Sequence, residues 1–294
     1  MELKILLVLC STLLISCSWR PKSDDSTLIE SLKKNNKQLG KPKEGEWLFQ
    51  HSEPGQTFQK YKTQQPVRPD SIRKIIYLLP IGDFSKDQKK LIEDCRDYLS
   101  RFFEINSKIL PVVPDDTISV EAKRKRKNGS IQLLAPYILE LLRKKMPPDA
   151  VVLMAITEKD LYPKPSWNFV FGLASIKNKV AVTSIYRYSD TIIDPLNYPL
   201  SLQRLIKTST HEIGHMFSMH HCTYAVCLMN GCNNLDESDS KPNRLCSECL
   251  SKMNWNLNFD LKKRQVALVD FFASHKLSRD YKESQADLKL LLSQ

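Results

Sequence analysis

Runs of apolar residues and amphipathic stretches alternate through the middle of the chain. Residues 72–82 and 150–157 are rich in β-branched and other apolar side chains, and their lengths suit buried strands. Residues 85–105 and 130–145 place apolar side chains at helical spacing. Ser85 is a candidate N-cap of the first helix, and the proline near the start of the second predicts a late start or a kink.

Further apolar segments and a long helix complete this pattern. Residues 108–115 predict a short strand, and residues 168–175 and 180–188 predict an antiparallel hairpin around a Lys/Asn turn. Residues 202–219 predict the next helix, whereas the basic run of residues 123–127 predicts a solvated loop. The order strand, helix, strand, helix, strand, hairpin and helix predicts an α/β domain with a mixed sheet.

The segments on either side of this middle part differ from it in composition. Residues 17–44 are polar and without periodicity, so we expect a tether. The aromatic residues within 45–71 predict an extension that docks on the domain, because aromatic side chains are rarely useful in a free linker. We therefore place the folded domain at residues 72–258. Residues 259–294 predict C-terminal helices, because apolar side chains recur there at helical spacing.

The N-terminal end of the chain resembles an export signal. A lysine precedes an apolar run from Ile5 to Ser16, which is too short to span a bilayer as a helix. The sequence LISC, which ends at Cys17, resembles the lipobox of bacterial lipoproteins, in which the cysteine is acylated. We therefore predict a lipoprotein signal peptide at residues 1–16 and a lipid anchor on Cys17, in the cell envelope and facing away from the cytoplasm. An ordinary signal peptide with an incidental cysteine is the alternative.

The overall composition restricts the class of protein. The chain has 294 residues, of which 41% are hydrophobic and 26% are charged, as in globular proteins, so disorder throughout is excluded. The net charge of +11 suits an anionic neighbour, such as nucleic acid or a lipid headgroup layer. Four of the six histidines lie within residues 211–221, and five of the eight cysteines lie within residues 222–249. This clustering of nitrogen and sulfur ligands indicates a metal site.

The sequence HEIGH begins at His211, on the helix predicted for residues 202–219. His211 and His215 are four residues apart, so both imidazoles project from one face of the helix and can bind the same zinc ion. Glu212 lies beside the first histidine, where its carboxylate can reach a water near the metal and act as a general base. This arrangement predicts a zinc-dependent hydrolase.

A third zinc ligand is expected downstream of this pair. His221, ten residues after His211, matches the HExxHxxxxxH spacing of the metzincin class of zinc peptidases. In that class a glycine ends the helix seven residues after the first histidine, and in this chain the position is occupied by Ser218. A residue other than glycine costs about 1–2 kcal/mol in the left-handed conformation, which keeps His220 as an alternative ligand. We favour His221.

A second group of potential ligands follows the histidines. Two cysteine pairs with the spacings C-x4-C and C-x2-C suit the tetrahedral binding of zinc by thiolates. The four residues are Cys222, Cys227, Cys246 and Cys249. In an exported protein the same thiols could form disulfides instead, and we favour zinc. Cys232 lies outside both pairs and is expected to be free or packed, and Cys95 is expected to be a buried core thiol.

Written together, residues 211–249 read HExxHx5HCx4CxMx16CxxC and closely resemble the archaemetzincin family of zinc peptidases. The resemblance extends from about residue 72 to residue 255 and includes the upstream sequences ITEKDLY and NFVFGLAS. It implies a metzincin-like domain with an active-site helix, a catalytic zinc site of three histidines and a structural zinc site of four cysteines, hence two ions per chain. It also implies that Met229 forms the turn beneath the catalytic metal and that residues 168–175 form the edge strand of the cleft. The substrate is then a peptide or a protein.

Two other classes of protein are compatible with part of this pattern. A zinc protein that has lost catalysis retains the same metal ligands. A basic module that uses the four cysteines to contact nucleic acid or protein also retains them, but it leaves Glu212 and the export signal unexplained. We therefore expect a monomeric zinc peptidase that is anchored to a membrane and binds no nucleic acid.

Overall fold

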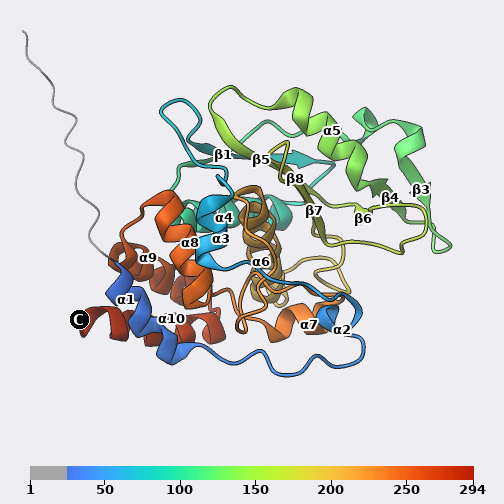
Figure 1. The fold of residues 1–294 in the computed structure, drawn as a ribbon. Helices are drawn as coiled ribbons and strands as arrows, with labels where there is room; N and C mark the ends of the chain where they lie inside the picture. The colour runs from blue at the N-terminus through green and yellow to red at the C-terminus, as the bar shows by residue number, and fades with distance from the viewer. Residues whose placement is uncertain (1–24) are drawn as a thin grey trace, which may run out of the picture.

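The computed structural model describes residues 25–294, which form a mixed α/β fold with helices on both sides of a sheet (Figure 1). The predicted signal peptide of residues 1–16 and the predicted anchor Cys17 lie outside the described residues. Within residues 25–294, no helix is both long enough and apolar enough to cross a membrane.

The main sheet has five strands in the order β2-β1-β5-β8-β7. The first four run parallel, and β7 pairs antiparallel with β8 at the edge of the sheet. The strands are β1 (Ile75–Ile81), β2 (Ser107–Ile109), β5 (Ala150–Thr157), β7 (Gly172–Ser175) and β8 (Val180–Ser184). Strands β1 and β5 are buried along their whole length, as expected for continuous apolar runs in a sheet covered on both faces. The predicted mixed sheet is confirmed.

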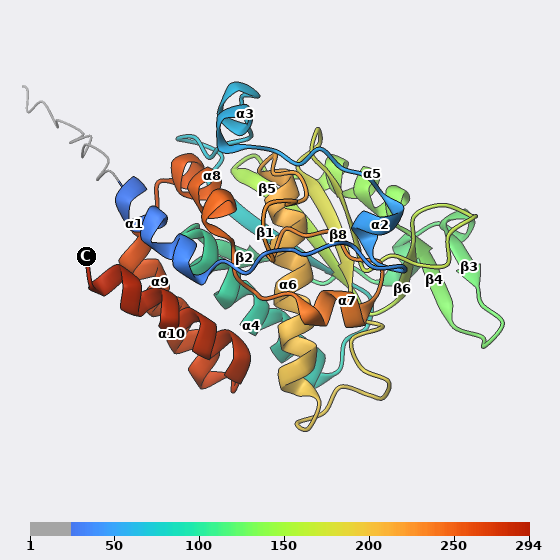
Figure 2. The ribbon, with the colours of Figure 1, turned by 60° about the horizontal axis from the view of Figure 1, so that its bottom comes forward.

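Helices cover both faces of this sheet (Figures 1 and 2). They are α4 (Lys86–Phe103) and α6 (Tyr198–Met216) on one face and α5 (Ala135–Lys145) on the other. Successive side chains of β1 point to opposite faces of the sheet, and each face carries its own hydrophobic core. Ile76 and Leu78 pack beside α4 and α6, and Tyr77 and Leu79 pack beside α5. Ser85 begins α4 with a capping box, as its position predicted.

Four shorter helices follow α6. They are α7 (Leu235–Ser240), α8 (Ser247–Leu257), α9 (Leu261–Ser274) and α10 (Ser278–Leu292). The last two correspond to the predicted C-terminal helices, and α9 packs against α4. The hydrophobic pattern did not predict α8, because this helix buries polar residues such as Lys252 and Asn256 among its apolar ones.

A smaller sheet lies beside the main one, with the strand order β3-β4-β6. Its strands are β3 (Lys123–Lys125), β4 (Ile131–Leu134) and β6 (Asp160–Tyr162), and the short 3-10 helices η2 (Asp115–Thr117) and η3 (Val120–Ala122) precede it. The prediction of a solvated loop for the basic run of residues 123–127 is wrong over β3. Arg124 donates to the carbonyl oxygen of Trp167 at 2.7 Å, and Arg126 pairs with the fully buried carboxylate of Asp160 at 2.9 Å. These partners hold the cationic run against the sheet.

The described part of the predicted tether packs against the C-terminal helices. It forms α1 (Ser26–Ser31) and the 3-10 helix η1 (Leu32–Asn35). Ile29 and Leu32 are buried in the main core, and the side-chain amide of Asn35 donates to Asp287 at 2.8 Å. Residues 26–36 therefore pack on the body and do not form the tether predicted for them, because buried apolar side chains and hydrogen bonds hold them there.

The extension of residues 45–71 also lies against the domain. It contains α2 (Trp47–Gln50), which lies beside α7, and α3 (Phe58–Thr63), which packs against α8 (Figure 1). Tyr61 is fully buried, and its hydroxyl donates to the carbonyl oxygen of Phe217 at 2.7 Å. The extension thus reaches the end of α6.

Candidate metal centre

Helix α6 carries the sequence HEIGH. Its apolar side chains, among them Leu205 and Ile213, are buried in the core with α4 and the sheet. His211 and His215 lie one turn apart on the side of the helix that lines a cleft beside β7. The helix ends at Met216, three residues earlier than the sequence predicted.

Ser218 follows the end of α6 in the left-handed conformation, with a φ of 69°. This is the position for which the family resemblance implies glycine. The backbone N–H of Val67 donates to the Ser218 hydroxyl at 3.1 Å, and the Gln56 side-chain amide donates to the Ser218 carbonyl at 3.0 Å. The extension of residues 45–71 therefore stabilises a backbone conformation that costs a residue other than glycine about 1–2 kcal/mol.

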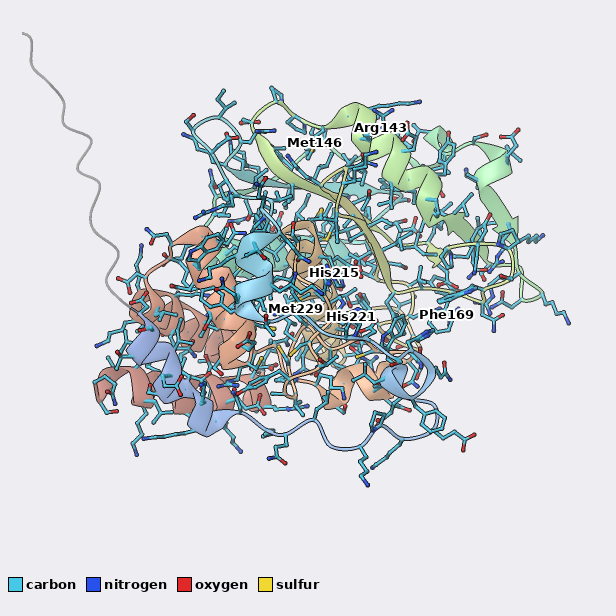
Figure 3. All side chains as sticks on the ribbon, in the orientation of Figure 1. Arg143, Met146, Phe169, His215, His221 and Met229 are labelled. Carbon is cyan, nitrogen blue, oxygen red and sulfur yellow. The ribbon has the colours of Figure 1, made fainter. Side chains whose placement is uncertain are left out.

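Beyond this turn, the chain brings a third histidine to the pair on α6. Ring nitrogens of His211, His215 and His221 all lie within 4.8 Å of one another. The Nε2 atoms of His211 and His215 are 3.0 Å apart, and the ring centroid of His221 lies 5.2 Å from that of His211. Figure 3 labels His215, His221 and Met229 near the middle of the view, and the ring centroids of His215 and His221 are 4.9 Å apart. His220 is exposed and does not belong to the group.

The two rings on α6 are oriented by backbone carbonyl groups. His211 Nδ1 lies 2.9 Å from the carbonyl oxygen of Leu228, and His215 Nδ1 lies 2.7 Å from that of Met219. These acceptors place the ring proton on Nδ1, so each Nε2 keeps a lone pair directed at the common centre. Burial lowers the pKa of His211 to about 4 and lowers that of His215 as well, which keeps both rings neutral. Neutral imidazoles with converging lone pairs suit a zinc ion.

The third ring is oriented by a carboxylate from the N-terminal extension. Glu53 Oε1 lies 2.9 Å from Nδ1 of His221 and also accepts from Trp47 Nε1 at 2.9 Å. The Trp47 ring meets the His221 ring edge-on, with centroids 5.2 Å apart. Trp47 also lies against Gly231, where an added Cβ would be 2.4 Å from its ring. The role of Glu53 was not predicted from the sequence, because its aromatic surroundings indicate docking but no spacing connects position 53 to position 221.

Glu212 lies on α6 between the histidines and the sheet edge. It is 8% exposed, and its carboxylate faces Gly172 of β7, where an added Cβ would lie 2.7 Å from Oε1. Gly172 therefore leaves room for this carboxylate. Burial raises the pKa of Glu212 to about 8. Such a shift is typical of a carboxyl group in a site with little water, where the charged form is poorly solvated.

The four paired cysteines form a second donor group directly behind the third histidine. Their Sγ atoms lie within 4.8 Å of one another, and all four side chains are buried. The members are Cys222, Cys227, Cys246 and Cys249. The sulfurs of Cys222 and Cys246 are 3.6 Å apart, far beyond a disulfide bond of about 2.05 Å. Hydrogen bonds from the neighbouring thiols lower the pKa of Cys222, whereas burial raises the pKa of Cys227 and hydrogen bonding with Cys222 raises that of Cys249.

The remaining described cysteines lie elsewhere. Cys95 is fully buried in the core, with its Sγ 3.5 Å from the hydroxyl of Ser209. Cys232 is half-buried, lines the cleft and belongs to neither donor group. Both positions match what the sequence predicted for these two thiols.

Met229 lies between the two donor groups. Its carbonyl oxygen accepts from the Cys222 backbone N–H at 2.7 Å. Its sulfur packs so closely on α6 that a Cβ added to Gly214 would lie 2.6 Å from it. Gly214 therefore permits a close contact between the helix and the Met229 turn, beneath His211 and His215.

A cleft of about 500 Å³ opens in front of the three histidines. Strand β7 forms one wall, and it pairs only with β8, so its other edge is free of strand partners among the described residues. Helix α6 and the segment after Met229 form the opposite wall. The lining residues are Trp47, Pro163, Lys164, Trp167, Phe169, Val170, Phe171, Gly172, Leu173, Ala174, Ile176, Lys207, Thr208, His211, Glu212, His215, His221, Leu228, Asn230, Cys232, Asn233, Ser238 and Lys241.

A mixed α/β domain that places HExxH, a third histidine and an edge strand around one cleft has the features of the zinc metallopeptidases. The sequence model of peptidase family M54 matches residues 92–255, more than half of the chain. The chain belongs to this family, the archaemetzincins, and is a zinc metallopeptidase.

Individual relatives agree with this assignment. Archaemetzincin-2 of Homo sapiens is 33% identical, with 76% of this chain and 71% of that protein covered. Archaemetzincin-2 of Rattus norvegicus is 32% identical, with 77% and 72% covered. The crystal structure of archaemetzincin from Methanopyrus kandleri superposes with a TM-score of 0.50 at 27% identity, covering 65% of this chain and 99% of that one. The resemblance inferred from the motif is confirmed, and Glu53 lies outside the residues that the family model matches.

Proposed function

We propose that this protein hydrolyses peptide bonds at a zinc ion held by His211, His215 and His221, with Glu212 as the general base. The observation that carries the proposal is the convergence of three histidine rings beside a buried carboxylate, in a cleft bordered by an edge strand. The donor chemistry fits zinc, because Nδ1 of each ring has an acceptor and Nε2 remains for a metal.

The chemistry divides between the metal and Glu212. When bound, zinc acts as a Lewis acid that lowers the pKa of water and polarises the carbonyl group of the scissile bond. Glu212 accepts a proton from the attacking water and delivers it to the leaving amine nitrogen. Burial raises the pKa of Glu212 to about 8, and a cation held by His211, His215 and His221 would oppose this shift by favouring the carboxylate form that acts as the base.

The edge strand supports an extended substrate. Residues Gly172–Ser175 of β7 pair with β8 along one side only. Backbone N–H and C=O groups on the other side can therefore bind a peptide as an additional strand. Such binding holds the backbone of the substrate next to Glu212, which faces Gly172. We infer that the substrate is a peptide, or an unstructured segment of a protein.

A second zinc ion is proposed at the four cysteines. Four buried thiols in mutual contact suit tetrahedral coordination and leave no position for water or substrate, so this ion is structural. Cys222 follows His221 directly in the chain, and its N–H is bound to Met229. The thiolate site therefore stabilises the backbone that carries the third catalytic ligand.

Attachment to the cell envelope through a lipid on Cys17 is also proposed. The support is the apolar N-terminal segment that ends in LISC. Ser26, the first residue of α1, follows Cys17 by nine positions, so the stretch between them spans at most about 30 Å. The peptidase would then work close to the membrane surface.

The proposed activity is tested by incubating the purified protein with a peptide library and identifying the products by mass spectrometry. Cleavage should disappear after removal of zinc with a chelator and return when zinc is added. Absence of cleavage by the zinc-loaded protein across a diverse library would contradict the proposal.

A further inference from the structure

A buried lysine lies in the wall of the catalytic cleft, away from the metal ligands. Lys207 is on α6, one helical turn before His211, and lines the same cleft. It is only 5% exposed. One turn corresponds to a rise of about 5.4 Å, and both residues line the cleft, so Lys207 lies on the same wall as the histidines, beside the position of a bound substrate.

The hydrogen bonds of Lys207 leave part of its donor capacity unused. Its Nζ donates to the carbonyl oxygens of Ser238 and Lys241, both at 2.8 Å. An ammonium group has three N–H donors, so one of them has no partner among the described residues. The two carbonyl groups come from the end of α7 and its following residue, whose partial negative charge stabilises a cation.

No carboxylate of the described residues forms an ion pair with Lys207. The nearest carboxylates have other partners, since Asp239 pairs with Arg204 at 2.6 Å and Asp280 accepts from Gln203 at 2.6 Å and from Asn243. Burial lowers the pKa of Lys207, while Asp280 and Asp239 act in the opposite direction. A buried cation without a counter-ion is costly, and buried charges in proteins are normally paired.

The other charges of the cleft have the same sign. Besides Lys207, the lining residues include Lys164 and Lys241. The only carboxylate that lines the cleft within the described chain is Glu212, which faces Gly172 and serves the metal site. The cleft therefore offers several cationic groups for an anionic ligand and only one carboxylate, which is already assigned to the reaction.

We propose that Lys207 binds a carboxylate of the substrate and that this peptidase prefers peptides carrying one next to the scissile bond. The carboxylate comes from an acidic side chain or from a free C-terminus, since both present the same group to the ammonium. This inference rests on the proposed function, because it names the substrate class of the same cleft. An alternative role for Lys207 is to cap the end of α7 only.

The test compares matched peptides that differ only in charge. Peptides with Glu or with the isosteric Gln at each position flanking the cleaved bond are assayed, together with C-terminally amidated forms. One Glu position should be cleaved with a kcat/KM about 10- to 100-fold above that of its Gln counterpart, as expected for a hydrogen bond to a charged group. If the preference depends instead on a free C-terminus, amidation abolishes it. Equal cleavage of all pairs would overturn the inference and leave the peptidase activity intact.

Substitution of Lys207 separates recognition from a structural role. In Lys207→Met the ratio of kcat/KM between the Glu and Gln peptides should approach one, whereas Lys145→Met, which removes an exposed charge at the end of α5, should leave it unchanged. If Lys207 only caps α7, Lys207→Met would lower the cleavage of the Glu and the Gln peptides equally. The ratio of their kcat/KM values would then be preserved, which would contradict the inference. Should no peptide be cleaved at all, the proposed function fails. Calorimetric binding of the two peptides to zinc-loaded Glu212→Gln then still decides whether Lys207 selects a carboxylate.

Discussion

At the scale of single residues, the site depends on groups that orient the histidines as much as on the histidines themselves. Two rings are oriented by carbonyl oxygens of the backbone, and the third is oriented by the carboxylate of Glu53. A carboxylate raises the basicity of the opposite ring nitrogen more than a carbonyl does. The strength with which His221 binds zinc therefore depends on one side chain that is distant in the sequence, Glu53.

Replacement of Glu212 by Gln removes the proposed base without removing a histidine. Zinc content should be unchanged, while peptide hydrolysis falls by roughly 10²–10⁴-fold, the usual contribution of general base catalysis. Metal analysis and steady-state kinetics measure the two effects. Glu140→Gln, on α5 at the other face of the sheet, is the control that should retain activity. Full activity in Glu212→Gln would contradict the assigned role.

Replacement of Glu53 tests the orientation of the third ring. Glu53→Ala removes the acceptor of His221 Nδ1, so the affinity for catalytic zinc should fall about 10- to 100-fold. Glu53→Gln retains one acceptor oxygen and should lose less. Competition for zinc against a chelator of known affinity measures the zinc affinity of the unmodified protein and of both variants. An unchanged zinc affinity in Glu53→Ala would show that the carboxylate is not needed to hold the ring.

At the scale of secondary structure, α6 and α8 are joined through the two donor groups. Helix α6 carries His211 and His215, and α8 carries Cys249, with Cys246 at its N-cap. The segment between them contains His221 and the other two cysteines of the donor group, Cys222 and Cys227. A metal ion at the four thiols would therefore connect α8 to the turn that ends α6, and it would stabilise a stretch that contains only the short helix α7.

Cys246→Ser should remove one ligand of the structural ion. The zinc content is expected to drop from two ions per chain to about one, with a lower melting temperature, because the thiolate site contributes binding energy to folding. Hydrolysis should also decrease, since His221 is adjacent to Cys222. Cys232→Ser, outside the cluster, should keep both ions. Two ions retained in Cys246→Ser, or one ion and disulfides in the unmodified protein, would refute the two-metal proposal.

At the scale of the whole molecule, the N-terminal segments wrap around the body and complete the metal site. These segments precede residues 92–255, which the family model matches. Residues 25–36 pack against the C-terminal helices, and the chain then runs across the body to α2 (Figure 2). The extension delivers Trp47 to the cleft, Glu53 to the ring of His221 and Gln56 to the end of α6. A lipid on Cys17 would hold this wrapped body near a membrane.

Cys17→Ala tests the membrane attachment. Without an acylation site the protein should move from the membrane fraction to the soluble envelope fraction, because the proposed acyl chains supply the hydrophobic binding energy. Cys10→Ala, within the apolar run of the signal, should leave the protein on the membrane. Fractionation followed by immunoblotting measures both. Unchanged membrane binding of Cys17→Ala would exclude this cysteine as the anchor.

Local pattern was sufficient for the parts of the protein in which neighbouring residues act together. The apolar runs of β1 and β5, the amphipathic helices and the pair His211 and His215 depend on periodicities of two or four residues, which a sequence displays directly. The same holds for the close spacing of the cysteine pairs. The α/β class, the family and the zinc chemistry were therefore predictable from the sequence.

Tertiary structure decided everything that depends on residues far apart in the chain. Only folding brings Glu53 to His221, places the N-terminal segment on the C-terminal helices, and leaves Lys207 in the cleft without a carboxylate partner. It also stabilises Ser218 where glycine was expected, through bonds from Gln56 and Val67. The physical reason is that hydrogen bonding and desolvation depend on what surrounds a group in three dimensions, and no local period encodes that environment.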